Sequence, residues 1–403
     1  MISKIERQKD VINLFEKLDI SPTMYKNAIE KYKSITAYLE ANGIDADMYI
    51  QGSFALGTVV RPYSKDNNKG YDMDVVCKLR YSRSDITAKQ ARDEVRDILS
   101  AKDLYGGKMQ EYDECFTIVY ADINDVGFSI DIVPATDEDF SKKNELKNVA
   151  KIPDLIDTAI AIPQGDVDWL TNNPIGYRKW FGRINEPFKN YNQDARRKVL
   201  FESAKQAYAT IEEVPEELDR TSMQRVVQIM KHHRNVYFAN LKNGKTLKPK
   251  SAIFTTLIAH IAAQAPSSYG VYELLEFVLS ELKTYGEYQT IIRESFEQKY
   301  PLKKIIYKDK NGEWHVDNPA NPQDNLADSW NNVEGMANAF FSWLDMMAKD
   351  LVESLNLEDT QFGTILESAF GYDTVNRNLA MDKYKVKKAI EFTKEQQKSP
   401  WSK

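Results

Sequence analysis

The spacing of apolar side chains predicts two helices at the start of the chain. Residues 3–19 follow the period of a short amphipathic helix. Ser21 and Pro22 supply the N-cap and the first position of a longer helix, and Gly43 stands where a left-handed C-cap would end it. The apolar residues of this second helix are Tyr25, Ala28, Ile29, Tyr32, Ile35 and Leu39. We therefore expect a long helix that lies across another part of the fold.

The pattern changes to alternation between residues 45 and 135. Strand-like runs in this region cover 48–50, 72–77, 116–120 and 128–133. A helix is predicted over 87–101, and residues 124–127 (Asn-Asp-Val-Gly) have the composition of a tight hairpin turn. A mixed sheet with helices on one side suits an α+β lobe better than a doubly wound parallel sheet.

From residue 174 onward the pattern is mostly helical. Helices are predicted over 174–185, 191–209, 221–240, 250–264, 269–299, 331–355, 360–370 and 373–396. Residues 305–316 interrupt them with a predicted hairpin whose turn is Asn311-Gly312. The chain is therefore expected to form two lobes, an α+β lobe over 1–170 and a mostly helical lobe over 171–403.

Composition excludes several protein classes. The chain has 403 residues, 42% hydrophobic and 28% charged, with a formal net charge of −6, which excludes a disordered chain and a broadly basic nucleic-acid coat. Cys77 and Cys115 are too few for a zinc module or a disulfide framework. The charged start lacks the apolar core of a signal peptide, and the most apolar stretch, 253–265, is shorter than the roughly 20 residues that cross a bilayer. We expect a cytoplasmic protein.

Basic residues are concentrated in one region. Residues 171–250 contain 16 Lys and Arg against 8 Asp and Glu, an excess of +8, so the rest of the chain carries −14. This excess fits either a solvated helical face or a wall that opposes an anionic ligand, and charge alone favours the solvated face.

Three aspartates form the strongest chemical pattern. Asp72 and Asp74 lie two apart on a predicted strand, so their side chains share one face of the sheet. Asp131 follows the same alternation on a later strand and could be brought beside them by strand pairing. Three clustered carboxylates are costly unless a cation neutralises them, and oxygen ligands favour magnesium or manganese over zinc. Each aspartate alone would more often be a solvated strand end, an N-cap or the partner of an arginine.

Gly52 and Ser53 form a second pattern upstream of the aspartates. A strand that ends in Gly-Ser and turns into a short helix exposes backbone N–H groups, and the Ser53 hydroxyl adds one more donor. A lone Gly-Ser is usually only a turn. Together with the three acids, however, a phosphate seat beside a cation site is typical of nucleotidyl transfer by two metal ions.

The order Gly-Ser, Asp-x-Asp and late Asp resembles the nucleotidyltransferase superfamily that includes polymerase β and poly(A) polymerase. The chain is more closely similar to the CD-NTases, the bacterial relatives of cyclic GMP-AMP synthase and oligoadenylate synthase. The segments that carry this closer resemblance are 169–181, 223–238, 248–251 and 318–325. The resemblance extends from the first long helix to about residue 350.

The resemblance implies a polymerase β-like catalytic lobe with a long N-terminal helix, and a helical lobe that completes the nucleotide pocket in the cleft. It implies that Asp72 and Asp74 are a metal-binding pair and that Asp131 is the third acid, near the attacking hydroxyl. The nucleotide-binding residues that it implies are Gln51, Gly52, Ser53, Lys231 and Ser251. From spacing alone, Lys231 would be an ordinary surface lysine. Relatives can have a base-stacking tyrosine after the serine; here the residue is Ala252, so the stacking partner is unassigned.

The function that the resemblance implies is template-independent synthesis of a cyclic di- or trinucleotide from NTPs, in antiphage signalling. The reaction would use two Mg²⁺ or Mn²⁺ ions per site and release pyrophosphate, and we expect ATP among the substrates. We expect a monomer with no membrane and no stable nucleic-acid partner. A regulatory protein, or modification of the polar tail at 398–403, is the expected form of control.

Two other functions remain open from the sequence. The first is a transferase that adds NMP to an RNA, a protein or a small molecule, with the basic stretch 225–250 holding an RNA backbone. The second is a nucleotide-binding or assembly module with a silent site, which the three crowded carboxylates argue against. A nucleic-acid-activated sensor is disfavoured by the acidic net charge and the lack of a Cys/His metal finger.

Overall fold

The first lobe is built on a mixed sheet. The computed structural model describes residues 2–61, 63, 70–101, 103–123, 126–203 and 218–385. Within these residues one sheet has seven strands, in the order β1-β2-β5-β4-β3, with β6 joined to β5 and β7 to β6. Their bounds are β1 Ala46–Ile50, β2 Tyr71–Ser82, β3 Met109–Glu111, β4 Phe116–Ile123, β5 Val126–Asp137, β6 Ile160–Gln164 and β7 Asp168–Asn172. Strands β2 and β5 run parallel, and the other pairs are antiparallel.

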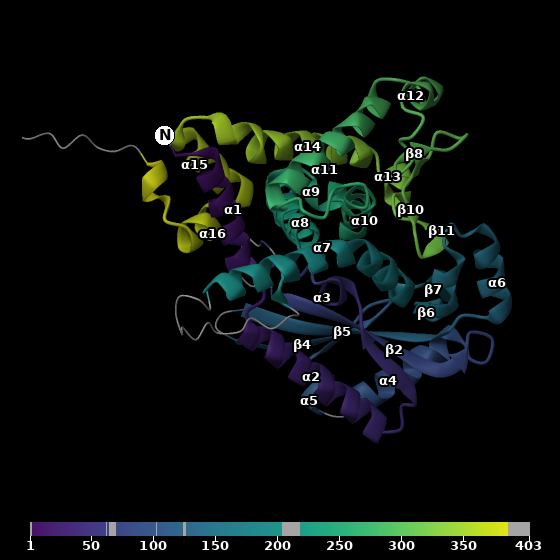
Figure 1. The fold of residues 1–403 in the computed structure, drawn as a ribbon. Coiled ribbons are helices and arrows are strands. Elements are labelled where there is room, and N and C mark those ends of the chain that lie inside the picture. Colours follow the sequence, from purple (N-terminus) through teal and green to yellow (C-terminus); the bar gives the residue numbers. More distant parts are fainter. Residues whose placement is uncertain are drawn as a thin grey trace, which may run out of the picture.

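Apolar alternation gives the sheet its buried face. Met73, Val75, Ile130 and Ile132 have no exposed surface, and they alternate along β2 and β5 with polar residues. Helices α2 (Pro22–Ala41), α4 (Ala88–Ser100) and α5 (Asp103–Gly106) lie on one side of the sheet, as Figure 1 shows. The first part of the chain also contains α3 (Gly52–Leu56), α6 (Phe140–Val149) and a short 3-10 helix over Pro153–Thr158.

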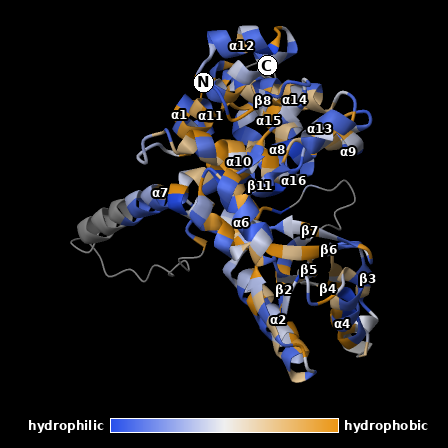
Figure 2. Cartoon of the chain, turned by 90° about the vertical axis from the view of Figure 1, so that its right-hand side faces the viewer, coloured by the Kyte–Doolittle hydropathy of each residue, from blue (hydrophilic) through white to orange (hydrophobic). Residues whose placement is uncertain are grey.

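The second lobe is mostly helical and lies on the other side of the sheet (Figure 1). Its longer helices are α7 Pro174–Ser203, α8 Ser222–Asn240, α10 Ser251–Ala262, α11 Val271–Tyr285, α14 Met336–Leu351 and α15 Asp359–Phe370. Its shorter helices are α9 Gly244–Leu247, α12 Arg293–Lys299, α13 Asp328–Asn332 and α16 Tyr372–Asn378. Figure 2 shows hydrophobic residues gathered at α10, most of whose side chains are buried. The predicted α+β class with a helical second lobe is confirmed.

Two small hairpins complete the second lobe. Strands β8 (Tyr307–Lys308) and β9 (Trp314–His315) form the predicted Asn-Gly hairpin. Strands β10 (Asp317–Asn318) and β11 (Asn321–Asn325) form a second hairpin that the hydrophobic pattern did not indicate. No helix in the described part of the chain is both long enough and apolar enough to cross a bilayer.

Helix α1 (Lys4–Leu18) packs with the helical lobe, although it precedes the sheet in the sequence. Its buried residues Val11, Leu14, Phe15 and Leu18 belong to the same apolar core as α8, α10 and α14, whereas α2 shares the core of the sheet. The lobe boundary at residues 170 and 171 stays a prediction.

Two predicted helix boundaries were wrong in the first half of the helical lobe. The helices predicted over 174–185 and 191–209 are one helix, α7, up to Ser203, and it continues through Pro187. Buried Phe181 and Phe188 lie on the same face on either side of this proline, and their packing offsets the backbone bond that it cannot make. Residues 204–209 lie outside the described residues.

The helices predicted over 269–299 and 331–355 are both interrupted. The first ends at Tyr285, and Tyr288 in the following 3-10 turn stacks on Phe296 of α12, with ring centroids 3.7 Å apart. The second is divided between α13 and α14 by Gly335, whose φ of +81° suits a glycine.

The last predicted helix, 373–396, is shorter than expected. Helix α16 ends at Asn378, and the Lys17 ammonium donates to the Asn378 carbonyl at 2.6 Å, which satisfies one of the free carbonyls at that end. Residues 386–396 and the tail at 398–403, as well as the turn residues 124 and 125, lie outside the described residues.

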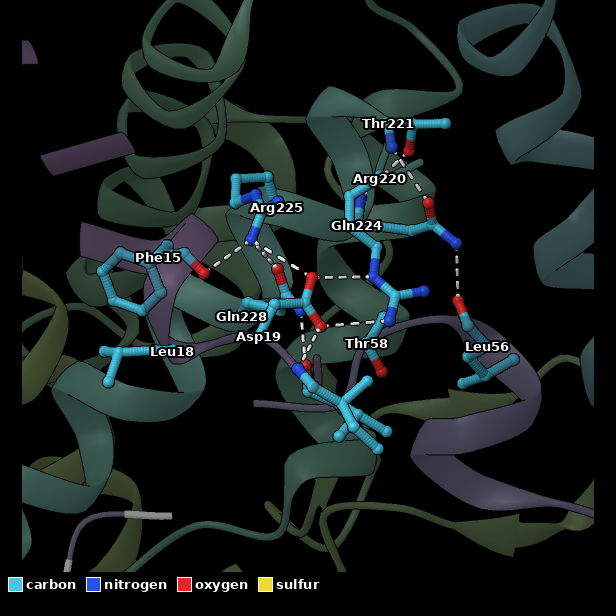
Figure 3. A network of polar contacts seen from close by, with 12 residues as sticks. Phe15, Leu18, Asp19, Leu56, Thr58, Arg220, Thr221, Gln224, Arg225 and Gln228 are labelled. Carbon is cyan, nitrogen blue, oxygen red and sulfur yellow. Dashed lines mark hydrogen bonds and ion pairs between the residues drawn. The ribbon is translucent and has the colours of Figure 1, made fainter. Parts of the chain in front are cut away.

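A buried ion-pair network joins the end of α1 to the start of α8 (Figure 3). Arg220 donates to both carboxylate oxygens of Asp19, from Nε at 2.9 Å and from Nη2 at 3.1 Å. Arg225 approaches Asp19 at 3.4 Å and donates to the carbonyl of Phe15 at 2.8 Å. Only 3%, 10% and 8% of the side-chain surfaces of Arg220, Arg225 and Asp19 are exposed, so the pair is largely removed from water.

Removing the carboxylate should therefore be costly. We expect Asp19→Ala to lower the free energy of unfolding by about 3–5 kcal/mol, because it removes a buried carboxylate that two buried guanidinium groups contact. The control is Asp45→Ala, which breaks the exposed Arg80–Asp45 pair and should cost less than about 1 kcal/mol. Urea unfolding of both variants measures the difference, and equal losses would contradict the role given to Asp19.

Candidate active site

The three aspartates meet on one face of the sheet. Strands β2 and β5 pair in parallel with Asp74 opposite Asp131 and Asp72 opposite Ser129. Since side chains two apart on a strand share a face, all three carboxylates project from the side opposite the buried Met73 and Ile130. The predicted proximity of these residues thus follows from one strand register.

Asp131 is held in place from the neighbouring strand. Thr117 on β4 lies directly opposite Asp131, and its hydroxyl donates to Oδ1 at 2.7 Å. Burial raises the pKa of Asp131, the Thr117 hydrogen bond acts in the opposite direction, and the charge of Asp72 raises the pKa further. Asp131 is thus a fixed carboxylate that binds a proton more readily than an exposed one.

Among the three aspartates, Asp74 has the pKa that its surroundings raise most. Burial, followed by the charges of Asp72 and Asp131, raises the pKa of Asp74 to about 7, and Lys231 opposes this rise. Burial and the charge of Arg234 lower the pKa of Lys231 to about 8, against the effect of Asp72 and Asp74. The acids and Lys231 therefore share one electrostatic field, although they come from different lobes.

Gly52 lets the first turn of α3 approach the acids. The backbone N–H of Gln51 donates to the carbonyl of Asp74 at 2.8 Å, which joins the end of β1 to β2. Gly52 has a φ of +62°, and a Cβ on it would overlap the Asp74 carboxylate. The position therefore needs glycine for both its backbone angle and its space. Ser53 follows in the same turn and lines the cavity described below.

Helix α8 holds the loop that follows α3. Three of its side chains, spaced along one face, donate to main-chain carbonyls at the end of α3 and in the loop after it. The pairs are Gln224 to Leu56 at 2.9 Å, Gln228 to Val59, and Lys231 to Thr58 at 3.2 Å. The first of these contacts is visible in Figure 3. Lys231 is therefore not an ordinary surface lysine, because it reaches the loop of the other lobe.

A cavity of about 280 Å³ opens between the two lobes beside these residues. Five segments line it: the α3 region, the start of α7, Lys231 of α8, the start of α10, and the β10–β11 hairpin. The lining residues include all five predicted nucleotide-binding residues, Gln51, Gly52, Ser53, Lys231 and Ser251. The lining also includes residues to which the sequence analysis assigned no role: Asn172, Arg178, Thr255, Asn318, Asp324 and Leu326. A signal existed for four of these residues, since Asn172 and Arg178 belong to the segment 169–181 and Asn318 and Asp324 to the segment 318–325.

Ser251 has a partner within the protein. Its hydroxyl accepts a hydrogen bond from Nη1 of Arg234 at 2.8 Å, and Arg234 also donates to the carbonyl of Pro249 at 2.9 Å. The Arg234 guanidinium lies over the Phe254 ring, and its side chain is buried. Arg234 and Arg225 are thus internal supports, so two charges of the basic stretch form neither a solvated face nor a wall around a ligand.

The donor set of the three aspartates fits a divalent cation. It consists of carboxylate oxygens, which magnesium and manganese prefer. Among the described residues, three potential ligand atoms lie within 4.8 Å of one another at Asp309, Glu313 and His315 on the β8–β9 hairpin, whereas the three aspartates are not gathered so tightly. Mutual repulsion keeps such carboxylates apart, and a shared cation would draw them together.

The chain is similar to known proteins over nearly its whole length. Residues 6–185 match the domain described as Second Messenger Oligonucleotide or Dinucleotide Synthetase. A protein of Roseivirga ehrenbergii named c-di-GMP synthase is 25% identical over 380 residues, which cover 92% of this chain and 86% of that protein.

Two solved structures share the fold. The CD-NTase CdnG of Bradyrhizobium diazoefficiens, in complex with GTP, aligns with a TM-score of 0.63 at 19% identity and covers 93% of this chain and 98% of its own. The Vibrio cholerae DncV cyclic AMP-GMP synthase, in complex with a linear intermediate, aligns with a TM-score of 0.50 at 16% identity and covers 84% of this chain and 70% of its own.

Crowding at Asp74 should destabilise the metal-free protein at high pH. The folded state keeps the Asp74 proton up to a pKa of about 7, whereas the unfolded chain loses it near the ordinary value of 3.8, so stability falls as pH rises between these values. Asp74→Asn removes this loss. We therefore expect the variant to melt at a higher temperature than the wild type in EDTA, and by a larger margin at pH 8 than at pH 5.

Thermal unfolding at both pH values measures this margin. Asp168→Asn, at an exposed position at the start of β7, is the control and should change the melting temperature little at either pH. A margin for Asp74→Asn that is absent, or that does not grow with pH, would contradict the charge crowding.

Proposed function

Because this chain belongs to the CD-NTase family of nucleotidyltransferases, we propose that Asp72, Asp74 and Asp131 are the carboxylates with which it joins nucleoside triphosphates. The chain synthesises a cyclic oligonucleotide second messenger. The observation that carries the residue assignment is the β2–β5 register, which sets Asp131 opposite Asp74 beside a cavity between the lobes.

The product that we infer is a cyclic dinucleotide that contains guanine. The R. ehrenbergii relative is named c-di-GMP synthase, and the V. cholerae structure is that of a cyclic AMP-GMP synthase. Both names describe rings of two nucleotides. ATP, the substrate expected from the sequence, stays a prediction.

Each bond would form by in-line displacement. The ribose hydroxyl of one nucleotide attacks the α-phosphorus of another, the bond from that phosphorus to the β-phosphate oxygen breaks, and pyrophosphate leaves. Asp131 accepts the hydroxyl proton, and its orientation by Thr117 favours this role. A second displacement, with a second pyrophosphate released, closes the ring.

The phosphates would be bound by groups from both lobes. The Ser53 hydroxyl and the N–H groups in the first turn of α3 donate to the phosphate oxygens, and the Lys231 ammonium balances their charge from α8. Divalent cations, two Mg²⁺ or Mn²⁺ ions held by the three aspartates, would supply the remaining positive charge and make the attacking hydroxyl more acidic.

We also propose the antiphage role and the cytoplasmic location that the resemblance implies. A plating assay tests the first: cells that carry the intact locus should resist phage, and cells with Asp74→Asn in place of the wild type should not. Equal resistance would refute the antiphage role while leaving the synthase activity open to its own test.

Loss of any one of the three carboxylates should abolish synthesis. With Mg²⁺ or Mn²⁺ and the four NTPs alone, we expect Asp72→Asn, Asp74→Asn and Asp131→Asn each to reduce pyrophosphate release at least about 100-fold. Asp47→Asn on the neighbouring strand β1, whose carboxylate pairs with Lys78, should retain activity.

The same experiment separates the alternatives. Mass analysis of the phosphatase-resistant products identifies a ring, which needs no acceptor. Pyrophosphate release that depends on an added RNA or protein would favour an NMP transferase instead, and a variant with near wild-type turnover would refute the assignment of that aspartate.

Lys231 should act through its charge. We expect Lys231→Met to lower kcat/KM for NTPs by about 10- to 100-fold, the usual effect of losing a charge-assisted hydrogen bond. Because Lys231 lowers the pKa of Asp74, its loss should also move the acidic limb of the pH–rate profile to higher pH. Lys245→Met, at an exposed position on α9, is the control. An unchanged pH profile would refute the electrostatic coupling between Lys231 and Asp74.

A further inference from the structure

One carboxylate lines the cavity itself, that of Asp324 on the β10–β11 hairpin. Asp324 lines the cavity together with Ser53 and Lys231, but it belongs to a different segment from the three aspartates of the sheet. We propose that Asp324 determines base specificity by accepting the N1–H and N2–H groups of guanine. This inference rests on the proposed function, since it takes the cavity to be the nucleotide site.

Asn318 positions the Asp324 side chain. Its amide Nδ2 donates to Oδ2 of Asp324 at 2.8 Å, and its own Oδ1 accepts from the backbone N–H of Ala320 at 3.0 Å. Both ends of the Asn318 amide are thus used within the hairpin, so the hydrogen bond to Asp324 has a defined direction. The Asp324 carboxylate is therefore fixed before any ligand arrives.

The hairpin itself is fastened to the junction between the lobes. Asn173, just before α7, donates from Nδ2 to the carbonyl of Ala320 at 2.9 Å. Asn321 donates from Nδ2 to the carbonyl of Thr171 at 2.9 Å. Both asparagines are buried. The segments that carry Asn172, Arg178 and Asp324 on the cavity wall are thus held as one unit, as a site that discriminates between similar ligands requires.

Asp324 has acceptor capacity left for a ligand. No donor within the described residues bonds to its Oδ1, and Asn318 uses only one direction at Oδ2. Burial raises the pKa of Asp324, and the charge of Lys250 acts against this rise. A partly buried carboxylate of this kind gains most from a ligand that brings N–H donors.

Among the nucleobases, guanine matches this carboxylate best. Its Watson–Crick edge presents two adjacent donors, N1–H and N2–H, which fit the two oxygens of one carboxylate, whereas adenine presents the lone pair of N1, which the carboxylate would repel. Arg178 lines the same cavity, and a guanidinium can donate to the O6 and N7 acceptors of guanine. The polar groups of the wall therefore complement guanine and oppose adenine.

Xanthine provides a test based on a gain of activity, which a variant that has merely lost its structure would not show. It keeps N1–H but has a carbonyl in place of the guanine 2-amino group, so it suits an amide better than a carboxylate. We expect Asp324→Asn to lower kcat/KM for GTP at least tenfold and to raise kcat/KM for XTP above the wild-type value. ATP serves as the reference substrate that should gain little.

The control is Asp328→Asn, four residues further along the chain. Asp328 is exposed, contributes to the charge felt by Asp324 and does not line the cavity. We expect this variant to keep the wild-type preference for GTP. The assignment of Asp324 is overturned if Asp324→Asn keeps that preference without gaining XTP, if it loses GTP, ATP and XTP equally while remaining folded by circular dichroism, or if the wild type prefers ATP.

Calorimetric titration with GTP, ATP and XTP separates this inference from the proposed function. Wild-type protein that binds GTP in preference to ATP but releases no pyrophosphate would refute the synthase activity and support the role of Asp324. Protein that makes a product from NTPs but binds GTP and ATP equally would refute Asp324 as the guanine-binding residue and leave the synthase activity standing.

Discussion

Three carboxylates have to share one face of a partly buried sheet, where like charges repel. Asp74 shows the cost most clearly, since its surroundings raise its pKa to about 7. The acids are held in place by apolar side chains on the opposite face of the same two strands. These side chains have no exposed surface; they are Met73, Val75, Ile130 and Ile132. A shift of one residue in the β2–β5 register would move the acids to the buried face. The apolar core therefore sets the geometry of the site, against the repulsion within it.

Helix α8 provides the second support, because it joins the site to the other lobe. Its side chains hold the carbonyls of the loop after α3, and its first turn is fixed by the Asp19 network at the end of α1. Lys231 lies on the same helix, so the ammonium that opposes the acids is positioned by the contacts that dock the lobes. A change that loosens this docking would shift the charge balance at Asp74 without touching an acid.

Local signals in the sequence were sufficient to predict an element and its bounds where a capping residue and the hydrophobic period agree. Helix α2 begins after Ser21 and ends before Gly43 as predicted, and the shared face of Asp72 and Asp74 follows from strand alternation alone. The place of Asp131 could not be derived in this way, because the alternation of β5 does not reveal that this strand pairs in parallel with β2. The boundaries of α7, α11 and α16 were missed because aromatic packing and long-range caps decided them.

Counting charges was the weakest guide, because it takes no account of burial. Arg225 and Arg234 contributed to the basic excess of residues 171–250, yet both are buried and bond to groups inside the protein. The cavity, by contrast, is lined by five separate segments, and its residues near α3 and its residues on the β10–β11 hairpin come from different parts of the chain. A nucleotide that spans it would contact both lobes at once, so its binding free energy would depend on how the lobes are docked. Base recognition and phosphate binding would then be coupled through the docking contacts of α8 and of the β10–β11 hairpin.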